Sequence, residues 1–145
     1  MRAADYREIM CQLPPGHDPA DAGHACFLMT QPGWRWQANI KGNPVACFGL
    51  AQFTYPVWAG WAFGMPSMRR CIPAISRHFR QQRARILAEG CRCIEVRALK
   101  THSEAHLWIK SLGATYRRDL PDRGRDGETF ELWDWVYSEQ ENHAP

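Results

Sequence analysis

Arginine is the residue type in this sequence best suited to hold a ligand. The 18 basic residues comprise 15 arginines and three lysines, and six of the arginines fall within 17 residues: Arg69, Arg70, Arg77, Arg80, Arg83 and Arg85. Guanidinium groups make paired hydrogen bonds to phosphate and carboxylate, so this segment predicts contact with an anion. The solvated outer face of a helix and the arginine bias of a GC-rich genome are the competing explanations.

A nucleic-acid surface would use the same arginines for phosphates and aromatic residues for stacking. The net charge of +3 is low for that role. Trp34 and Trp36 share one expected strand face, as do Trp133 and Trp135, and such pairs indicate core or a partner surface. We therefore do not expect a nucleic-acid partner.

Cysteine and histidine provide the other reactive groups. Cys91 and Cys93 precede His102 and His106, a pattern that invites comparison with a zinc site, but the two-residue cysteine spacing is tighter than usual. We interpret the cysteines as reduced core residues and predict no metal. Cys71 stands near an expected helix start, where a thiol can be reactive, although a packed cap residue explains it as well.

The elements that must position these residues follow from hydrophobic periodicity. Short helices are expected over residues 5–12 and 18–31. Three strands over 34–40, 45–53 and 57–65 predict an antiparallel meander, the first with one wet face. A helix over 73–89 ends at Gly90, a strand covers 92–99, a helix with the capping box Thr101–Glu104 ends at Gly113, and two strands cover 114–118 and 129–137. The order predicts an α/β fold with a mixed, mostly antiparallel central sheet flanked by helices on both faces.

The segment His102–Gly113, followed by Ala114-Thr115-Tyr116, resembles the helix and strand that close the acetyl-CoA site in the GNAT superfamily of N-acetyltransferases. The match is carried by Ala105, Trp108 and Gly113. The resemblance covers roughly residues 34–136 and implies one GNAT-like domain over 1–138, with a flexible tail at 139–145. Within the superfamily, Trp58–Phe63, Arg69-Arg70 and Ser103–Gly113 are similar to small bacteriophage proteins, including internal virion proteins of T7-like phages.

The resemblance also implies a set of site residues. The backbone of Phe63, Gly64 and Met65 would hold the pantetheine arm of acetyl-CoA, and Arg69, Arg70, Cys71 and Ala74 fall where the family binds the pyrophosphate. The family's glycines are missing there, and Pro73 removes an N–H donor. Ile109 stands where the family often has a tyrosine acid, so His102 and Tyr116 are the substitute catalytic candidates.

The implied function is an acyl-CoA-binding domain that transfers acetyl from acetyl-CoA to an amine, with a degenerate cofactor motif. The alternative is a non-catalytic GNAT-fold phage virion or assembly component whose partners are other phage structural proteins. No apolar run reaches the roughly 20 residues that span a bilayer, and the charged start lacks a secretory signal. We expect a protein of the host cytoplasm or the virion, without membrane contact, and leave a homo-oligomer open.

Overall fold

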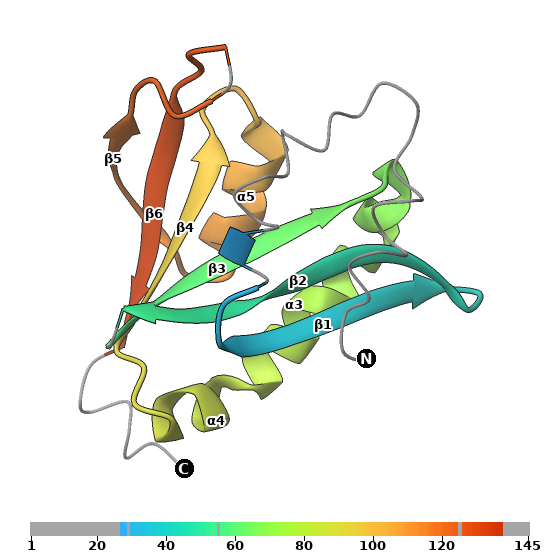
Figure 1. Ribbon diagram of the computed structural model, residues 1–145. Coiled ribbons are helices and arrows are strands. Elements are labelled where there is room, and N and C mark those ends of the chain that lie inside the picture. The colour runs from blue at the N-terminus through green and yellow to red at the C-terminus, as the bar shows by residue number, and fades with distance from the viewer. Residues whose placement is uncertain (1–26, 29, 55, 125, 138–145) are drawn as a thin grey trace.

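A six-stranded sheet organises the chain in the computed structural model, which describes residues 27–28, 30–54, 56–124 and 126–137. Its strands are β1 (Gly33–Ile40), β2 (Asn43–Thr54), β3 (Val57–Gly64), β4 (Cys93–Leu99), β5 (Thr115–Leu120) and β6 (Phe130–Val136). They lie in the order β1-β2-β3-β4-β6-β5, and every neighbouring pair except β3–β4 is antiparallel. The predicted meander of the first three strands and the mixed, mostly antiparallel sheet are both confirmed (Figure 1).

The junction between β3 and β4 divides the sheet into two halves. These strands run parallel and pair only at Val57↔Cys93, Trp58↔Ile94 and Ala59↔Glu95. Beyond Ala59 they diverge, so that the two halves of the sheet open like a V in Figure 1. The gap between the diverging strands is the feature on which the candidate site depends.

The helical segments that follow the first three strands are η1 (Pro66–Cys71), α3 (Ile72–Gln81), α4 (Arg83–Ala88) and α5 (Ser103–Ser111). The single helix predicted over 73–89 is wrong in two respects. The helical path already begins in the 3-10 turn η1, and it is interrupted at Gln82, the C-cap of α3 and N-cap of α4, whose ψ of −5° differs from the usual helical value of about −42°. Neither glycine nor proline stands near this break, so the sequence carried no signal for it.

Helices α3 and α5 lie behind the sheet in the view of Figure 1, and α4 follows α3 at the lower edge of the picture. Ile86 of α4 and Ile109 of α5 share a core cluster with Trp58 and Ile94, while Ile75 of α3 packs in a second cluster with Phe48. The helices expected on the opposite face, over 5–12 and 18–31, fall largely outside the described residues. Phe27 and Leu28 are helical, lie in front of the sheet in Figure 1, and Leu28 is buried.

The predicted helix ends and the predicted exposed face of β1 are each confirmed only in part. Gly90 and Gly113 end α4 and α5 with φ of 93° and 102°, as expected of glycine after a helix. The capping box at Thr101–Glu104 is wrong: His102 is the N-cap of α5 and makes no side-chain cap bond. The wet face of β1 is also wrong at Gln37, which is only 2% exposed and donates to Asn39 Oδ1 at 2.7 Å.

Candidate functional site

The gap between β3 and β4 exposes backbone groups that no neighbouring strand pairs. Met65 N–H donates to Val45 O at 2.9 Å. Since hydrogen-bonded pairs alternate along an antiparallel ladder, Phe63 also bonds to β2, while the backbone groups of Ala62 and Gly64 point toward β4. Pairing with β4 has ended by then, at Ala59↔Glu95. The N–H and C=O groups of Ala62 and Gly64 therefore face the gap, where an extended ligand can bond to them as a further strand would.

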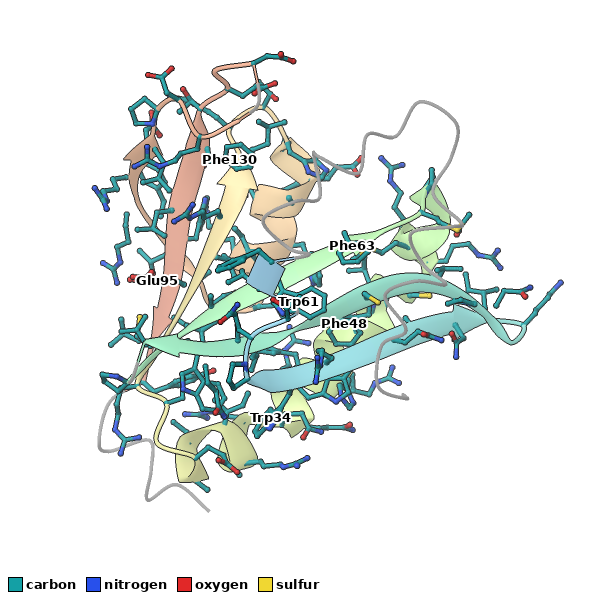
Figure 2. All side chains as sticks on the ribbon, viewed as in Figure 1. Trp34, Phe48, Trp61, Phe63, Glu95 and Phe130 are labelled. Atoms are coloured by element: carbon teal, nitrogen blue, oxygen red, sulfur yellow. The ribbon has the colours of Figure 1, made fainter. Side chains whose placement is uncertain are left out.

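Two of the three residues predicted to hold the pantetheine arm point elsewhere. Phe63 and Met65 use their backbone on β2, and the Phe63 ring stacks on Trp61 with centroids 6.0 Å apart. Figure 2 shows both rings on the face of the sheet opposite to α3. Gly64 alone of the three faces the gap through its backbone. Ala62, which the sequence did not single out, joins it there.

The turn from β3 into α3 offers little backbone to a phosphate. The N–H of Ile72 already donates to Arg69 O, and Pro73 has no N–H. Cys71, the N-cap of α3, is 8% exposed and packs with Ile75, so its thiol belongs to the core. Ala74 is exposed in the first turn of α3. Any phosphate bound here must rely mainly on side chains.

Arg69 and Arg70 are the side chains available at this turn, and they differ in their partners. Arg69 forms an exposed ion pair with Glu104 in the first turn of α5. This contact links η1 to α5 across the open end of the gap. Arg70 is exposed and pairs with no carboxylate among the described residues. The fit to acetyl-CoA is therefore through backbone at β3 and through guanidinium groups at η1.

Helices α3 and α5 are joined beside the gap. Trp108 Nε1 donates to Ser76 Oγ at 2.9 Å, and Arg80 donates to Ser111 O at 3.3 Å. Ile109, at the family's tyrosine position, is 7% exposed within the core. No proton donor for a departing thiolate is provided at that position.

The two predicted catalytic residues are not brought together. His102 is exposed at the start of α5. It is close in sequence to Glu104, whose ion pair with Arg69 crosses the open end of the gap. Tyr116 lies on β5, separated from the gap by β6 and β4, and its hydroxyl donates to Asp119 Oδ1 at 2.8 Å. That hydrogen bond raises the pKa of Tyr116, which makes it a weaker acid.

A second polar cluster, missed by the sequence, lies between α5 and β6. His106 Nε2 is 3.0 Å from Leu99 O and 3.4 Å from Glu131 Oε2, and its ring stacks on Trp133. His106 had been considered only as a zinc ligand with the cysteines. His102 precedes α5 as its N-cap and is exposed, whereas His106 lies within α5 and is mostly covered.

Of the cysteines that the structure describes, Cys47, Cys71 and Cys91 are buried and Cys93 is partly exposed. Burial raises the pKa of Cys91 and of Cys93 to about 11. Cys91 Sγ is 3.4 Å from Cys93 O. Within the described ranges, no group of three or more His, Cys, Asp or Glu side chains is placed to hold a metal ion.

Comparison with known proteins identifies the fold. No family model and no curated protein matches the sequence. Among solved structures, IAA acetyltransferase from Bacillus cereus is similar with a TM-score of 0.69 at 9% identity, over 92% of this chain and 93% of that one. Ribosomal-protein-alanine N-acetyltransferase from Brucella melitensis gives 0.68 at 10%, over 94% and 98%. For yncA from Salmonella typhimurium, solved with its cofactor acetyl-CoA, the values are 0.60 and 10%, over 86% and 72%.

The class defined by these likenesses is the GNAT fold of the N-acetyltransferases, as the segment His102–Gly113 had suggested. At 9–10% identity the likeness establishes the fold. None of the helices described here is both long enough and apolar enough to cross a membrane.

Proposed function

We propose that this protein is an acetyl-CoA-dependent N-acetyltransferase that acts on an amine. The observation that supports it is the gap between β3 and β4, where pairing stops at Ala59↔Glu95 and the backbone of Ala62 and Gly64 is left without a strand partner. Unpaired backbone groups on a rigid strand are suited to bind the amide groups of a pantetheine arm. Acetyl-CoA, when bound, supplies an acetyl thioester that an amine can attack directly.

The chain's own groups would share the work as follows. Ala62 and Gly64 orient the arm, and Arg70 contacts the pyrophosphate, joined by Arg69 when it leaves Glu104. His102, at the N-terminus of α5, is our candidate for accepting the proton of the attacking amine. Tyr116 is the weaker candidate, since two strands separate it from the gap and its proton is held by Asp119.

A second function is favoured by Ile109. A buried isoleucine at the tyrosine position removes the family's usual acid, and η1 replaces the glycine-rich turn. These observations support a GNAT-fold protein that has lost catalysis and serves as a bacteriophage virion or assembly component. Its location would then be the virion or the host cytoplasm.

Thermal unfolding with and without acetyl-CoA tests the proposal. A ligand at 100 times its dissociation constant stabilises the native state by about 2.7 kcal/mol, which raises Tm by several degrees. An unchanged Tm at millimolar acetyl-CoA would exclude the enzyme. Release of free thiol from acetyl-CoA in the presence of an amine panel then separates the two functions, because binding without turnover supports the non-catalytic one.

Ala62 allows a sharper test at the gap itself. Ala62→Pro removes an N–H that faces the gap and that β2 does not use, which a strand tolerates at an unpaired position. We expect this variant to lose most of its Tm shift with acetyl-CoA, whereas Ala62→Gly, which keeps the N–H, should retain it. Equal shifts in both variants would show that the arm does not bind along β3.

A further inference from the structure

The arginine-rich segment is only partly used by contacts within the protein. Three of its arginines are engaged by other side chains: Arg69 with Glu104, Arg83 over the Tyr137 ring at 5.9 Å, and Arg85 over the Trp34 ring at 4.7 Å. The other three are Arg70, Arg77 and Arg80. All three are exposed, and none pairs with a carboxylate in the part of the chain that the structure describes.

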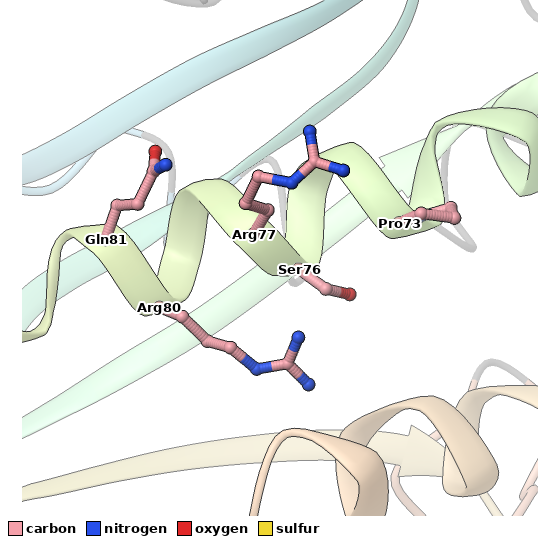
Figure 3. Close-up of a pocket in the computed structure, with 5 residues that line it drawn as sticks. All are labelled: Pro73, Ser76, Arg77, Arg80 and Gln81. Atoms are coloured by element: carbon pink, nitrogen blue, oxygen red, sulfur yellow. The ribbon is translucent and has the colours of Figure 1, made fainter.

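Two of these arginines line a groove on the outer side of α3. The groove is formed by Pro73, Ser76, Arg77, Arg80 and Gln81 (Figure 3). Ser76 and Arg80 point toward α5, and Arg77 extends along the opposite rim. Arg77 and Arg80 are three residues apart on one helix, so their flexible side chains can reach the same anion.

The groove is held in shape by contacts with α5. Ser76 is 6% exposed, and its hydroxyl accepts the hydrogen bond from Trp108 Nε1 at 2.9 Å. Arg80 donates to Ser111 O at 3.3 Å, a long bond to a neutral acceptor that a phosphate would readily replace. The groove therefore has Ser76 held in place at its base, and the flexible side chains of Arg77 and Arg80 at its edges.

Charge indicates what such a groove binds. The sequence contains no aspartate or glutamate between Asp21 and Glu89, so no carboxylate on η1, α3 or their connection offsets the arginines. On α5, the one carboxylate is Glu104, which is already paired with Arg69. A groove with two guanidinium groups and no local acid favours an anion, and phosphate is one that arginine binds through paired hydrogen bonds.

We propose that this groove binds the 3′-phosphate of the adenosine end of coenzyme A, through Arg77 and Arg80. This inference rests on the proposed function. With a rise of about 1.5 Å per residue, Arg77 lies about 8 Å along α3 from its first residue, Ile72, next to Arg69 and Arg70. Coenzyme A separates its 3′-phosphate from its pyrophosphate by one ribose ring, which matches that spacing. Arg77 and Arg80 would thus add a second phosphate contact beside a turn that lacks the glycine motif.

A nucleic-acid surface explains the same arginines less well. Arg83 and Arg85 stack on aromatic rings of this chain, and Arg69 is tied to Glu104. That leaves a short cationic site instead of the long stripe that a polyanion would follow. A single phosphate held by Arg77 and Arg80 fits this short site.

The test compares acetyl-CoA with acetyl-3′-dephospho-CoA, which lacks only the 3′-phosphate. We expect the wild-type protein to bind acetyl-CoA about tenfold more tightly, equal to about 1.4 kcal/mol, by isothermal titration calorimetry. In the double variant Arg77→Ala/Arg80→Ala this ratio should fall below about threefold, with affinity for the dephospho ligand unchanged. The control Arg118→Ala/Arg123→Ala removes two exposed arginines from β5 and the loop after it, and should keep the wild-type ratio.

Each outcome is decisive. A wild-type ratio near one, or an equal ratio in the double variant, would overturn the groove while leaving acetyl-CoA binding intact. If neither ligand binds the wild-type protein, the proposed function fails and the groove assignment fails with it. Tight binding of a short single-stranded RNA that Arg77→Ala/Arg80→Ala abolishes, with the ligand ratio unchanged, would overturn the assignment in favour of a nucleic-acid surface.

Discussion

The hydrogen bond between Trp108 and Ser76 should contribute measurably to stability, because it joins the two helices that flank the gap. Trp108→Phe removes the Nε1 donor and part of the indole ring, and leaves the buried Ser76 hydroxyl without its donor. A neutral hydrogen bond contributes about 1 kcal/mol net, and an unsatisfied buried partner adds about 1 kcal/mol or more. We expect Trp108→Phe to lower the free energy of unfolding by about 2 to 3 kcal/mol.

Urea unfolding of the wild type, Trp108→Phe, Ser76→Ala and the double variant completes a double-mutant cycle. The losses in unfolding free energy of the two single variants should add up to about 0.5 to 1.5 kcal/mol more than the loss in the double variant, since either substitution removes the same bond. A matched control combines Ser76→Ala with Trp135→Phe, because Trp135 donates instead to Leu112 O at 2.7 Å. Additivity within about 0.3 kcal/mol in the Trp108–Ser76 cycle, as in the control, would show that the contact does not couple the helices.

Three further predictions concern other side chains. Glu104→Gln should free Arg69 and tighten acetyl-CoA binding about two- to fivefold at low salt, measured by calorimetry; weaker binding would contradict this. Burial lowers the pKa of His78 below its ordinary value of 6.5, and its Nε2 has no hydrogen-bond partner among the described residues. The free energy of unfolding should therefore fall as pH drops below about 6.5, where the unfolded chain takes up the proton. His78→Phe should flatten that dependence in urea unfolding, and an unchanged slope would assign it elsewhere. Cys91 and Cys93, with pKa raised to about 11 by burial, should resist iodoacetamide in the native protein at pH 8 and react in guanidinium, as peptide mass mapping would show; rapid native labelling would contradict their burial.

Local patterns in the sequence were sufficient for most of the sheet. The alternation of residues predicted β1, and the glycines predicted where α4 and α5 end. Each of these signals depends only on residues that are neighbours in the chain. The GNAT-like segment around Ala105 and Trp108 carried the fold class, which the structural likenesses confirm. Gln37 shows the limit: its burial depends on what covers that face, which alternation within one strand cannot reveal.

The candidate site was harder to predict because it depends on contacts across the chain. Which backbone groups of β3 face the gap is set by the register with β2 and by the point where pairing with β4 ends. A sequence window cannot show either, so Phe63 and Met65 were selected together with Gly64, and Ala62 was missed. The ion pair of Arg69 with Glu104 joins residues 35 positions apart and likewise has no local signal.

The short junction between β3 and β4 also bears on how the protein folds. Each half of the sheet is built from strands close in sequence, β1-β2-β3 and β4-β6-β5, whereas the junction closes a loop from Val57 to Cys93 with three residue pairs. Loop closure costs entropy before such distant contacts compensate for it. The two halves should therefore form first and dock late, and backbone amides at the junction should exchange with solvent sooner than those in the centre of either half. The same opening that suits a ligand is then the place where this fold is most easily parted.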